Sequence, residues 1–324
     1  MTRILALALL AACGGDKGGD SASSSCPNNI LAAWPEDADA AAYYNTRVDY
    51  HFAVPDDGAA VVVTDSSGAE VSGTWTPDGT YYWWQADENL VAGESYTATL
   101  DWQCGVDERT FIVRGDLGTA TDASALAGKT WALDLRRARG VHPLGIDEVL
   151  AELIQFDLLV SVVSSDGTTL DWMAAVADDT GAQDACTPSI DIPSAGLESN
   201  PDVTVESDLL PIEVGGSTLE IDDMLLTGTF TPDGTQMEGV TIAGNVDTRP
   251  LAGVLTEEDD GDPNAVCELF QNNFNIRCTD CPDGTGVFCI DLVLDTISAP
   301  ETGFALTTIT DEEVSANPDC DTGT

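Results

Sequence analysis

Hydrophobic residues recur at every second position over long stretches of the chain, and turn residues separate these runs. Val48, Tyr50 and Phe52 share one face of an extended strand, and a Pro-Asp-Asp-Gly turn follows from Pro55. Further turn sequences recur at intervals of roughly 8 to 12 residues, which is typical of a β-sandwich. The pattern therefore predicts an N-terminal β-sandwich over residues 34–118.

Alternation at period two returns in residues 126–302 and predicts a second, larger antiparallel β domain, either barrel-like or a sandwich. One interruption has helical spacing, with apolar residues at Ile146, Val149, Leu150, Leu153 and Ile154. Asp147 and Glu148 then occupy the first turn, where acids suit the helix dipole. We expect a helix near 146–156 and a C-terminal tail over 303–324. The fold class expected is mainly β, with one or two short helices.

The first residues form a short apolar run, Ile4 to Ala12, preceded by Arg3. A membrane-spanning helix needs about 20 apolar residues, so residues 1–12 are predicted to be a signal peptide. Residues 13–33 begin with a run rich in Gly and Ser, and we expect them to form a flexible tether.

The end of the apolar run, Leu10-Ala11-Ala12-Cys13, resembles the lipobox of bacterial lipoproteins. The resemblance implies that Cys13 receives a diacylglyceryl group and becomes the first residue of the mature chain. Two or more acyl chains anchor a protein stably. The protein is then expected at the membrane through its lipid anchor, as an outer-membrane lipoprotein facing the periplasm or the cell surface. The alternative is an ordinary signal peptide, with Cys13 as a disulfide partner.

A second resemblance covers the predicted sandwich. The segment Leu90-Val91-Ala92-Gly93-Glu94-Ser95-Tyr96 resembles the tyrosine corner of fibronectin-type and bacterial Ig-like domains. From Trp34-Pro35 to Phe111-Ile112-Val113, the chain is similar to the Ig-like modules of bacterial surface proteins of the SbsA type. The resemblance implies that the Tyr96 hydroxyl bonds to backbone upstream of it. The chain departs from those modules at Trp102-Gln103-Cys104-Gly105, where they carry a turn rich in Asp and Gly.

The composition is strongly acidic, with 57 Asp and Glu residues against 11 Lys and Arg and a formal charge of -46. Binding to nucleic acid depends on basic residues that neutralise phosphates, so nucleic acid is excluded as a partner. Because 43% of the residues are hydrophobic and the acids are interleaved with them, we expect folded domains with solvated acidic faces.

The chain contains nine cysteines. Apart from Cys13, the disulfide candidates are Cys26, Cys104, Cys186, Cys267, Cys278, Cys281, Cys289 and Cys320. An even number in an exported chain indicates disulfides. We expect Cys26–Cys104, two bridges among the four cysteines from Cys267 to Cys289, and by elimination Cys186–Cys320. Zinc or redox chemistry at those four is the alternative, although a zinc site usually shows two close cysteine pairs.

Three surface features are candidates for binding. In an alternating strand, two of Tyr81, Tyr82, Trp83 and Trp84 face outward, where a sugar could stack, unless a neighbouring strand or the second domain covers them. The only basic cluster, at Arg136, Arg137 and Arg139, either pairs with acids of this chain or contacts lipid headgroups or an anionic ligand. The acidic run 257–262 either binds calcium or is a solvated loop, and it lacks EF-hand spacing.

The sequence contains no recognisable catalytic constellation. Its two histidines, His51 and His142, are far apart in sequence, and no nucleophile elbow, His-Glu-x-x-His motif or phosphate-binding loop is present. We therefore expect no enzyme activity, no cofactor and no metal. The predicted function is that of a lipid-anchored envelope protein that displays β-domains to an envelope protein or glycan. The alternative is a carrier of a lipid or other apolar ligand in the second domain, with the helix as a lid.

Overall fold

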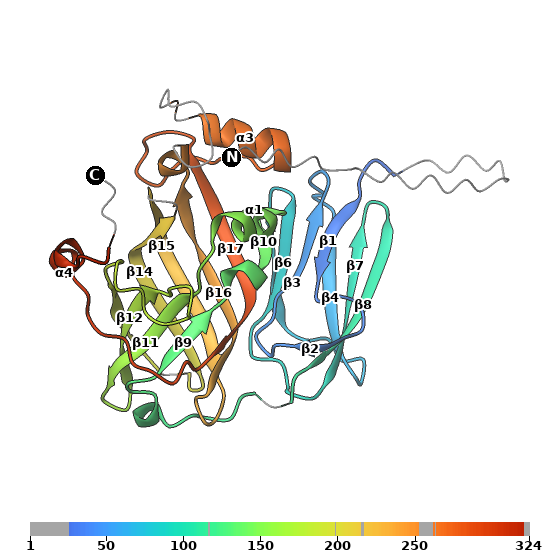
Figure 1. Ribbon diagram of the computed structural model, residues 1–324. Coiled ribbons are helices and arrows are strands. Elements are labelled where there is room, and N and C mark those ends of the chain that lie inside the picture. Colours follow the sequence, from blue (N-terminus) through green and yellow to red (C-terminus); the bar gives the residue numbers. More distant parts are fainter. Residues whose placement is uncertain are drawn as a thin grey trace.

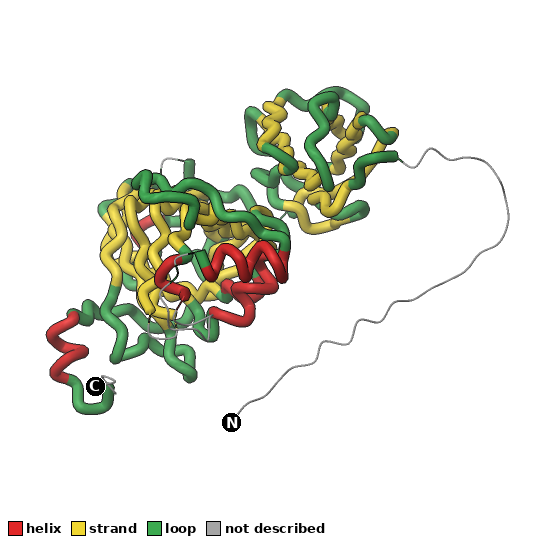
Figure 2. The backbone as a smooth tube through the Cα atoms, turned by 90° about the horizontal axis from the view of Figure 1, so that it is seen from above, coloured by secondary structure: helices red, strands yellow, loops and turns green. Residues whose placement is uncertain are grey.

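The computed structural model describes residues 26–115, 117–197, 199–214, 217–252, 262 and 264–320. The predicted signal peptide, the lipobox and most of the predicted tether lie outside the described residues, as does the acidic run 257–262 apart from Asp262. The chain is mainly β, as expected, and its strands form two domains (Figure 1). Figure 2 shows these domains as two separate groups of strands.

The first domain is a sandwich of two four-stranded sheets. One sheet has the order β1 (Ile30–Trp34), β3 (Val48–Phe52), β6 (Tyr81–Ala86), β5 (Gly73–Asp78). The other has the order β2 (Asp39–Ala42), β8 (Gly105–Val113), β7 (Ser95–Trp102), β4 (Ala60–Asp65). Only the β2–β8 pair is parallel among these ladders. Tyr50, Phe52 and Phe111 are fully buried between the sheets, as the alternation of β3 predicts.

Local turn chemistry places two features of this sandwich. The backbone N–H of Val91 donates to the hydroxyl of Tyr96 at 2.8 Å, which is the tyrosine-corner contact implied by the Ig-like resemblance. The β5–β6 hairpin turns at Gly79, whose φ of +57° lies in the left-handed region that favours glycine. Trp102 pairs with Gly105 across the next hairpin, which carries Cys104 at its tip.

The second domain contains a five-stranded and a four-stranded antiparallel sheet. The larger sheet has the order β10 (Arg139–His142), β17 (Cys289–Pro300), β16 (Gln236–Asp247), β15 (Ser217–Phe230), β14 (Asp202–Val214). The smaller has the order β13 (Ile190–Gly196), β12 (Thr169–Val176), β11 (Leu158–Ser165), β9 (Thr130–Leu133). Over the described residues the strands do not close into a barrel, so the sandwich alternative holds. Trp131 and Phe230 meet in the core, with ring centroids 5.0 Å apart.

Three α-helices are present among the described residues, one more than the upper expectation. The predicted helix is α1 (Ile146–Leu153), which ends before the expected residue 156 because Ile154 already has extended backbone. The others are α3 (Ala265–Phe274) and α4 (Asp311–Ala316), and α4 starts with a capping box at Thr310. The 3-10 turns are η1 (Ala123–Ala125), η2 (Leu135–Arg137) and η3 (Arg249–Leu251).

Four disulfides join the eight cysteines of the described residues: Cys26–Cys104, Cys186–Cys320, Cys267–Cys278 and Cys281–Cys289. These are the pairings expected from the sequence. They also explain two differences from the expected boundaries. The strand β1 begins within the segment expected to be a tether, where Cys26 is bonded to the sandwich, and α4 lies within the expected tail, where Cys320 is bonded to the second domain.

Candidate functional site

The four aromatic residues of β6 do not form an exposed platform. Tyr82 and Trp84 pack in the core of the first sandwich. Tyr81 is 3% exposed, because its ring stacks on His142 of the second domain with centroids 5.5 Å apart. Only Trp83 is half-buried. Of the two alternatives for the outward pair, the covered one is observed at Tyr81, because the second domain packs against this face of the strand.

The basic cluster pairs with acids of this chain. Arg136 donates to Asp134 at 2.7 Å and to Asp157 at 2.5 Å. Arg137 forms a 3.2 Å ion pair with the same Asp134, but its side chain is 87% exposed. Arg139 lies between two carboxylates at the domain junction. Internal pairing, one of the two alternatives, is thus observed, and Arg137 is the most exposed of the three side chains.

The junction between the two domains is built around Arg139 of β10. Its guanidinium donates to Asp295 of β17 at 2.8 and 2.5 Å and to Asp49 of β3 at 3.1 and 3.3 Å. The same group lies over the ring of Trp34, 4.3 Å from the centroid. The Asp49 side chain is 1% exposed, so its charge is balanced by the protein rather than by water. One arginine therefore joins a carboxylate from each domain.

Both histidines of the chain also lie at this junction. The ring of Tyr81 stacks on His51 at 4.5 Å and on His142 at 5.5 Å between centroids. Burial, together with the charges of His142 and Arg139, lowers the pKa of His51 to about 4. Burial lowers the pKa of His142 as well. The two imidazoles are thus uncharged at neutral pH, which suits their position near a guanidinium.

The two members of the buried ion pair have shifted pKa values. The pKa of Asp49 is raised to about 6, chiefly by burial; Arg139 opposes this shift, and the neighbouring charge of Asp295 contributes to it. Burial acts to lower the pKa of Arg139, but Asp49 and Asp295 outweigh burial and raise it. Asp49 therefore carries a charge at neutral pH and loses it on mild acidification.

A second contact closes the interface at Asp202, the first residue of β14. The hydroxyls of Tyr44 and Thr229 both donate to Asp202 Oδ1, the latter at 2.7 Å. Asn89 Nδ2 donates to the other carboxylate oxygen at 3.4 Å. Burial raises the pKa of Tyr44, and so does its hydrogen bond to Asp202. Since Tyr44 and Asn89 belong to the first domain, this carboxylate is a second fixed point between the domains.

A polar cleft of about 390 Å³ lies between the domains, and Asp202 and Asp295 from both contact points line it. The first domain contributes Tyr43, Asn45, Thr46 and Arg47 together with Gln85 and Asn89. The second domain contributes one face of its five-stranded sheet. Arg47 brings a positive charge into this cleft, and its guanidinium lies 5.6 Å from the centroid of Trp83.

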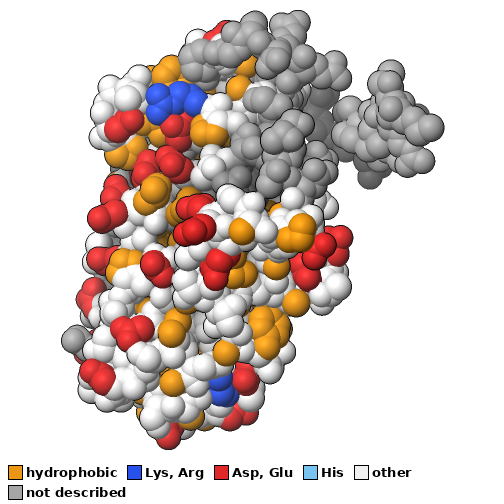
Figure 3. Space-filling view, turned by 60° about the vertical axis from the view of Figure 1, so that its left-hand side comes forward, with side chains coloured by type: hydrophobic (Ala, Val, Ile, Leu, Met, Phe, Trp, Pro, Cys, Tyr) orange, Lys and Arg blue, Asp and Glu red, His pale blue; other side chains and the backbone are white. Residues whose placement is uncertain are grey.

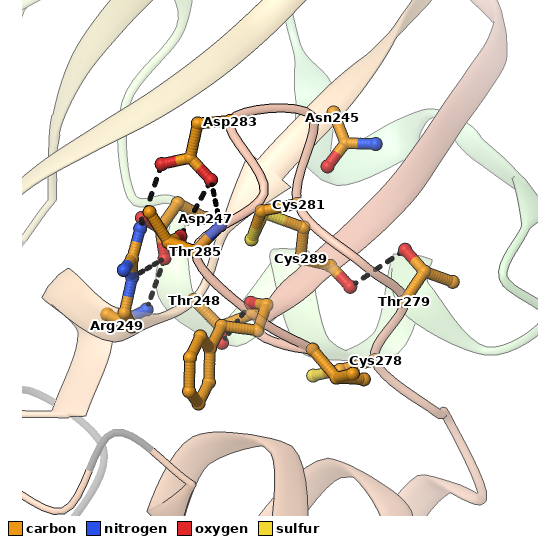
Figure 4. The surroundings of a disulfide bond; sticks show 12 residues. Asn245, Asp247, Thr248, Arg249, Cys278, Thr279, Cys281, Asp283, Thr285 and Cys289 are labelled. Carbon is orange, nitrogen blue, oxygen red and sulfur yellow. Dashed lines mark hydrogen bonds and ion pairs between the residues drawn. A yellow bond between two sulfur atoms is a disulfide. The ribbon is translucent and has the colours of Figure 1, made fainter.

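The cysteine-rich end of the second domain is cross-linked by disulfides. Ligand atoms of Asp247, Cys281 and Cys289 lie within 4.8 Å of one another, but the two sulfurs are bonded to each other. The bonded sulfurs are not the thiolates that zinc binds. Figure 4 shows the loop that carries Asp283 beside this disulfide, with Arg249 pairing with Asp247 at 2.5 Å. The residues present therefore do not fit the zinc alternative.

An apolar space beneath α1 bears on the carrier alternative. Ile146, Leu150, Ile221 and Leu294 are among the residues that line it. Its volume is about 30 Å³, enough for one or two water-sized spheres. An acyl chain does not fit this space in the present conformation, so the shape of the second domain gives no support to lipid carriage.

The surface of the second domain follows the overall charge. Acidic side chains are scattered over the face seen in Figure 3, with few basic groups among them. On this face, the acidic side chains are thus spread over the surface rather than collected in one site.

Most residues that form the junction and the cleft were not singled out from the sequence. Arg47, Asp49 and His51 alternate with the apolar residues of β3 and so share its second face. Three ionisable groups on one face of a strand indicate a polar surface. That this surface is covered, with every residue of β3 buried, follows only from the position of the second domain.

Comparisons with known proteins show distant structural similarity and no family. No family model and no curated protein matches the sequence. The structure of CopC from Methylosinus trichosporium OB3b is similar to 27% of this chain over 93% of its own length, with 18% identity and a TM-score of 0.23.

Two structures of the bacterial S-layer protein SbsC are similar at the same level. Its N-terminal part matches 49% of this chain over 44% of its own length, so this chain spans less than half of it, with 12% identity and a TM-score of 0.21. Domains 5-6 match 68% of this chain over 90% of their own length, with 9% identity and a TM-score of 0.21. Similarity this distant assigns no activity to the chain.

Proposed function

We propose that this protein is a lipid-anchored cell-envelope protein that acts by binding, without chemical turnover, and that the cleft between its domains is the binding site. The observation that carries the proposal is a polar cleft of about 390 Å³ between the two sandwiches. Ligand sites in proteins are concave, occur preferentially at domain interfaces and have volumes of about 300 to 1,000 Å³.

The two walls of the cleft are joined by contacts between the domains. The ion pairs of Arg139 hold one part of the interface, and the hydrogen bonds to Asp202 hold another. A preformed site does not lose binding free energy to the ordering of its walls. These contacts support recognition of a ligand as the role of the cleft.

The environment of the ionisable groups supports binding rather than turnover. Asp295 and Asp49 share the guanidinium of Arg139, and Asp202 accepts three hydrogen bonds from side chains. His51 is buried against Tyr81. A general acid or base must reach the proton that it transfers, and these groups are already engaged within the protein.

The disulfides support the proposed location. Four of them in one chain are typical of proteins that fold outside the cytoplasm. Of the helices described here, none has the length and apolarity to cross a bilayer. Attachment to a membrane is then proposed to depend on acylation of Cys13, which lies outside the described residues.

The test is a ligand screen with the purified mature chain. Ligand-observed NMR against a library of small envelope and extracellular compounds is expected to give binders. The Thr227→Trp variant, whose new side chain fills the cleft, should no longer bind them. Val163→Trp is the control, because Val163 is 49% exposed on β11 and does not line the cleft. Mass spectrometry of each binder after incubation should show it unchanged. The proposal would be contradicted if the protein hydrolysed a binder and a folded Asp202→Asn variant did not. It would also be contradicted if the binders bound the Thr227→Trp variant unchanged.

A further inference from the structure

An apolar row crosses the floor of the cleft. The register of the five-stranded sheet places Leu225 of β15 opposite Ala243 of β16, and Ala243 opposite Val293 of β17. All three side chains line the cleft and are half-buried. Neighbouring strands lie about 4.8 Å apart, so the row presents a flat apolar strip to whatever occupies the cleft.

A row of hydroxyls runs beside this strip. Thr204 of β14 pairs with Thr227 of β15, which pairs with Thr241 of β16, and all three line the cleft. Residues two positions apart on a strand point to the same face, so Thr227 lies next to Leu225 on that face. The floor therefore offers an apolar strip bordered by groups that both donate and accept hydrogen bonds.

The opposite wall carries donors and amides. The Arg47 guanidinium faces the cleft beside Trp83, and it forms no ion pair with any of the residues that the structure describes. Gln85 Nε2 donates to the backbone oxygen of Asn45 at 3.2 Å, which positions the side chain of Gln85. The side chain of Asn45 lines the same wall.

The charged groups of the cleft favour an uncharged ligand. An anion would meet Asp202 and Asp295 and the field of a chain with a formal charge of -46. A cation would meet Arg47, and the two carboxylates are already engaged: Asp295 pairs with Arg139, and Asp202 accepts three hydrogen bonds from side chains. A hydroxyl group can donate to an acceptor and accept from a donor without carrying charge, because it offers one donor and two acceptor positions.

We infer that the cleft binds an uncharged saccharide of one or two sugar units, an inference that rests on the proposed function. The apolar C–H face of the sugar ring lies on the strip at Leu225, Ala243 and Val293. Its hydroxyls meet the threonine row on one side and Arg47 with the amides of Asn45 and Gln85 on the other. The feature that selects a sugar is a flat apolar floor bordered by both hydrogen-bond donors and hydrogen-bond acceptors.

The experiment is isothermal titration calorimetry of the full mature chain in a detergent without a sugar headgroup. The neutral probes are glucose, galactose, N-acetylglucosamine, maltose and cellobiose, and the charged probes are glucuronate and glucosamine. Saturable binding of at least one neutral probe is expected, with both charged probes weaker by about tenfold or more. Arg47→Ala should weaken the neutral probe by about tenfold, the loss typical of a hydrogen bond from a charged donor.

Two controls separate binding from folding. Arg137→Ala removes an equal charge from an 87% exposed side chain outside the cleft and should leave affinity unchanged. Asn45→Ala removes a cleft amide without changing charge and should weaken binding, with near-UV circular dichroism confirming the fold. Absence of binding for every neutral probe, or tighter binding of glucuronate or glucosamine, overturns the saccharide inference. The proposed function survives those outcomes if library compounds bind the protein and do not bind its Thr227→Trp variant. If no compound binds the cleft, the proposed function and the saccharide inference both fail.

Discussion

Arg139 connects two hydrophobic cores that are otherwise packed separately. Its guanidinium is shared between Asp49 of the first domain and Asp295 of the second. A buried ion pair contributes little when intact, but removal of one partner leaves the other charge buried without compensation. Arg139 therefore stabilises the fold by compensating the charge of the buried Asp49.

We expect Arg139→Ala to lower the free energy of unfolding by about 3 to 5 kcal/mol, the cost typical of a broken buried pair. Urea denaturation followed by tryptophan fluorescence measures this, with each transition analysed separately because two domains can unfold in separate steps. Arg137→Ala is the matched control, since that side chain is 87% exposed and its removal should have little effect. Equal midpoints for the two variants would contradict the role given to Arg139.

The junction also makes stability depend on pH, through two groups that act in opposite directions. The pKa of His51 is about 4 in the folded protein, below its unfolded value of about 6.5, so its contribution is lost as the pH falls between them. This loss is at most about 3 kcal/mol. The pKa of Asp49 is about 6, above its ordinary value, so acidification over that range relieves the cost of burying its charge.

Between pH 6.5 and pH 4, His51→Gln should therefore lose less stability than the unchanged protein, and Asp49→Asn should lose more. Urea denaturation at intervals across this range measures both. The many other carboxylates are common to the three proteins and cancel in the differences, as do His142 and Arg139, which face the same cluster. Three parallel profiles would show that neither group titrates with the shifted pKa.

Strands and loops of this protein are held in place by disulfides of very different span. Cys186–Cys320 joins residues 134 apart in sequence and secures the segment that carries α4. Cys267–Cys278 joins residues only 11 apart, at the helix α3. In the chain-entropy model, a longer closed loop restricts the unfolded chain more and stabilises the fold more.

Removing Cys186–Cys320 with a double serine substitution should destabilise the second domain by about 5 kcal/mol, against about 3 kcal/mol for Cys267–Cys278. Thermal and urea denaturation of both double variants gives the comparison. Limited proteolysis adds a second readout, because release of α4 should expose residues 303–320 to cleavage in the first variant alone. A larger loss from the shorter loop would show that native contacts, and not loop closure, set the effect.

At the scale of the whole molecule, the charge and the proposed anchor define where the protein can act. A formal charge of -46 repels polyanions, so we do not expect membrane attachment through basic patches. The proposed attachment is acylation of Cys13, within Leu10-Ala11-Ala12-Cys13.

We expect Cys13→Ser to release the protein from membranes or to block its processing. Ultracentrifugation of cell membranes after a high-salt wash measures the first effect, and the mass of the mature N-terminus measures the second. Cys26→Ser is the control, because it removes a cysteine of the described residues that is bonded to Cys104. A Cys13→Ser protein that still sediments with lipid would show that the anchor is elsewhere.

The sequence by itself determined the local features of the fold. The core face of β3, the hairpin at Gly79 and the Tyr96 corner depend on residues within one strand or turn, so alternation and turn chemistry predicted them. The same holds for α1, where apolar residues at helical spacing lie within two turns. An even number of cysteines in an exported chain likewise indicated four disulfides. The short helix α4 was missed because none of its residues is buried and only Val314 and Ala316 are apolar. The helix α3 was also missed, although Val266, Leu269, Phe270 and Phe274 recur at helical spacing and pack on the core.

Only the tertiary structure decided which surfaces are covered. The face of β6 that carries Tyr81 points away from the core of its own sandwich. It is buried because His142 of the second domain packs against it. Asp49 and Asp295 are 246 positions apart by their numbers, 295 − 49, yet they share one guanidinium. Strand periodicity reports which residues share a face, but burial and pKa depend on what packs there, and that is fixed by contacts between domains.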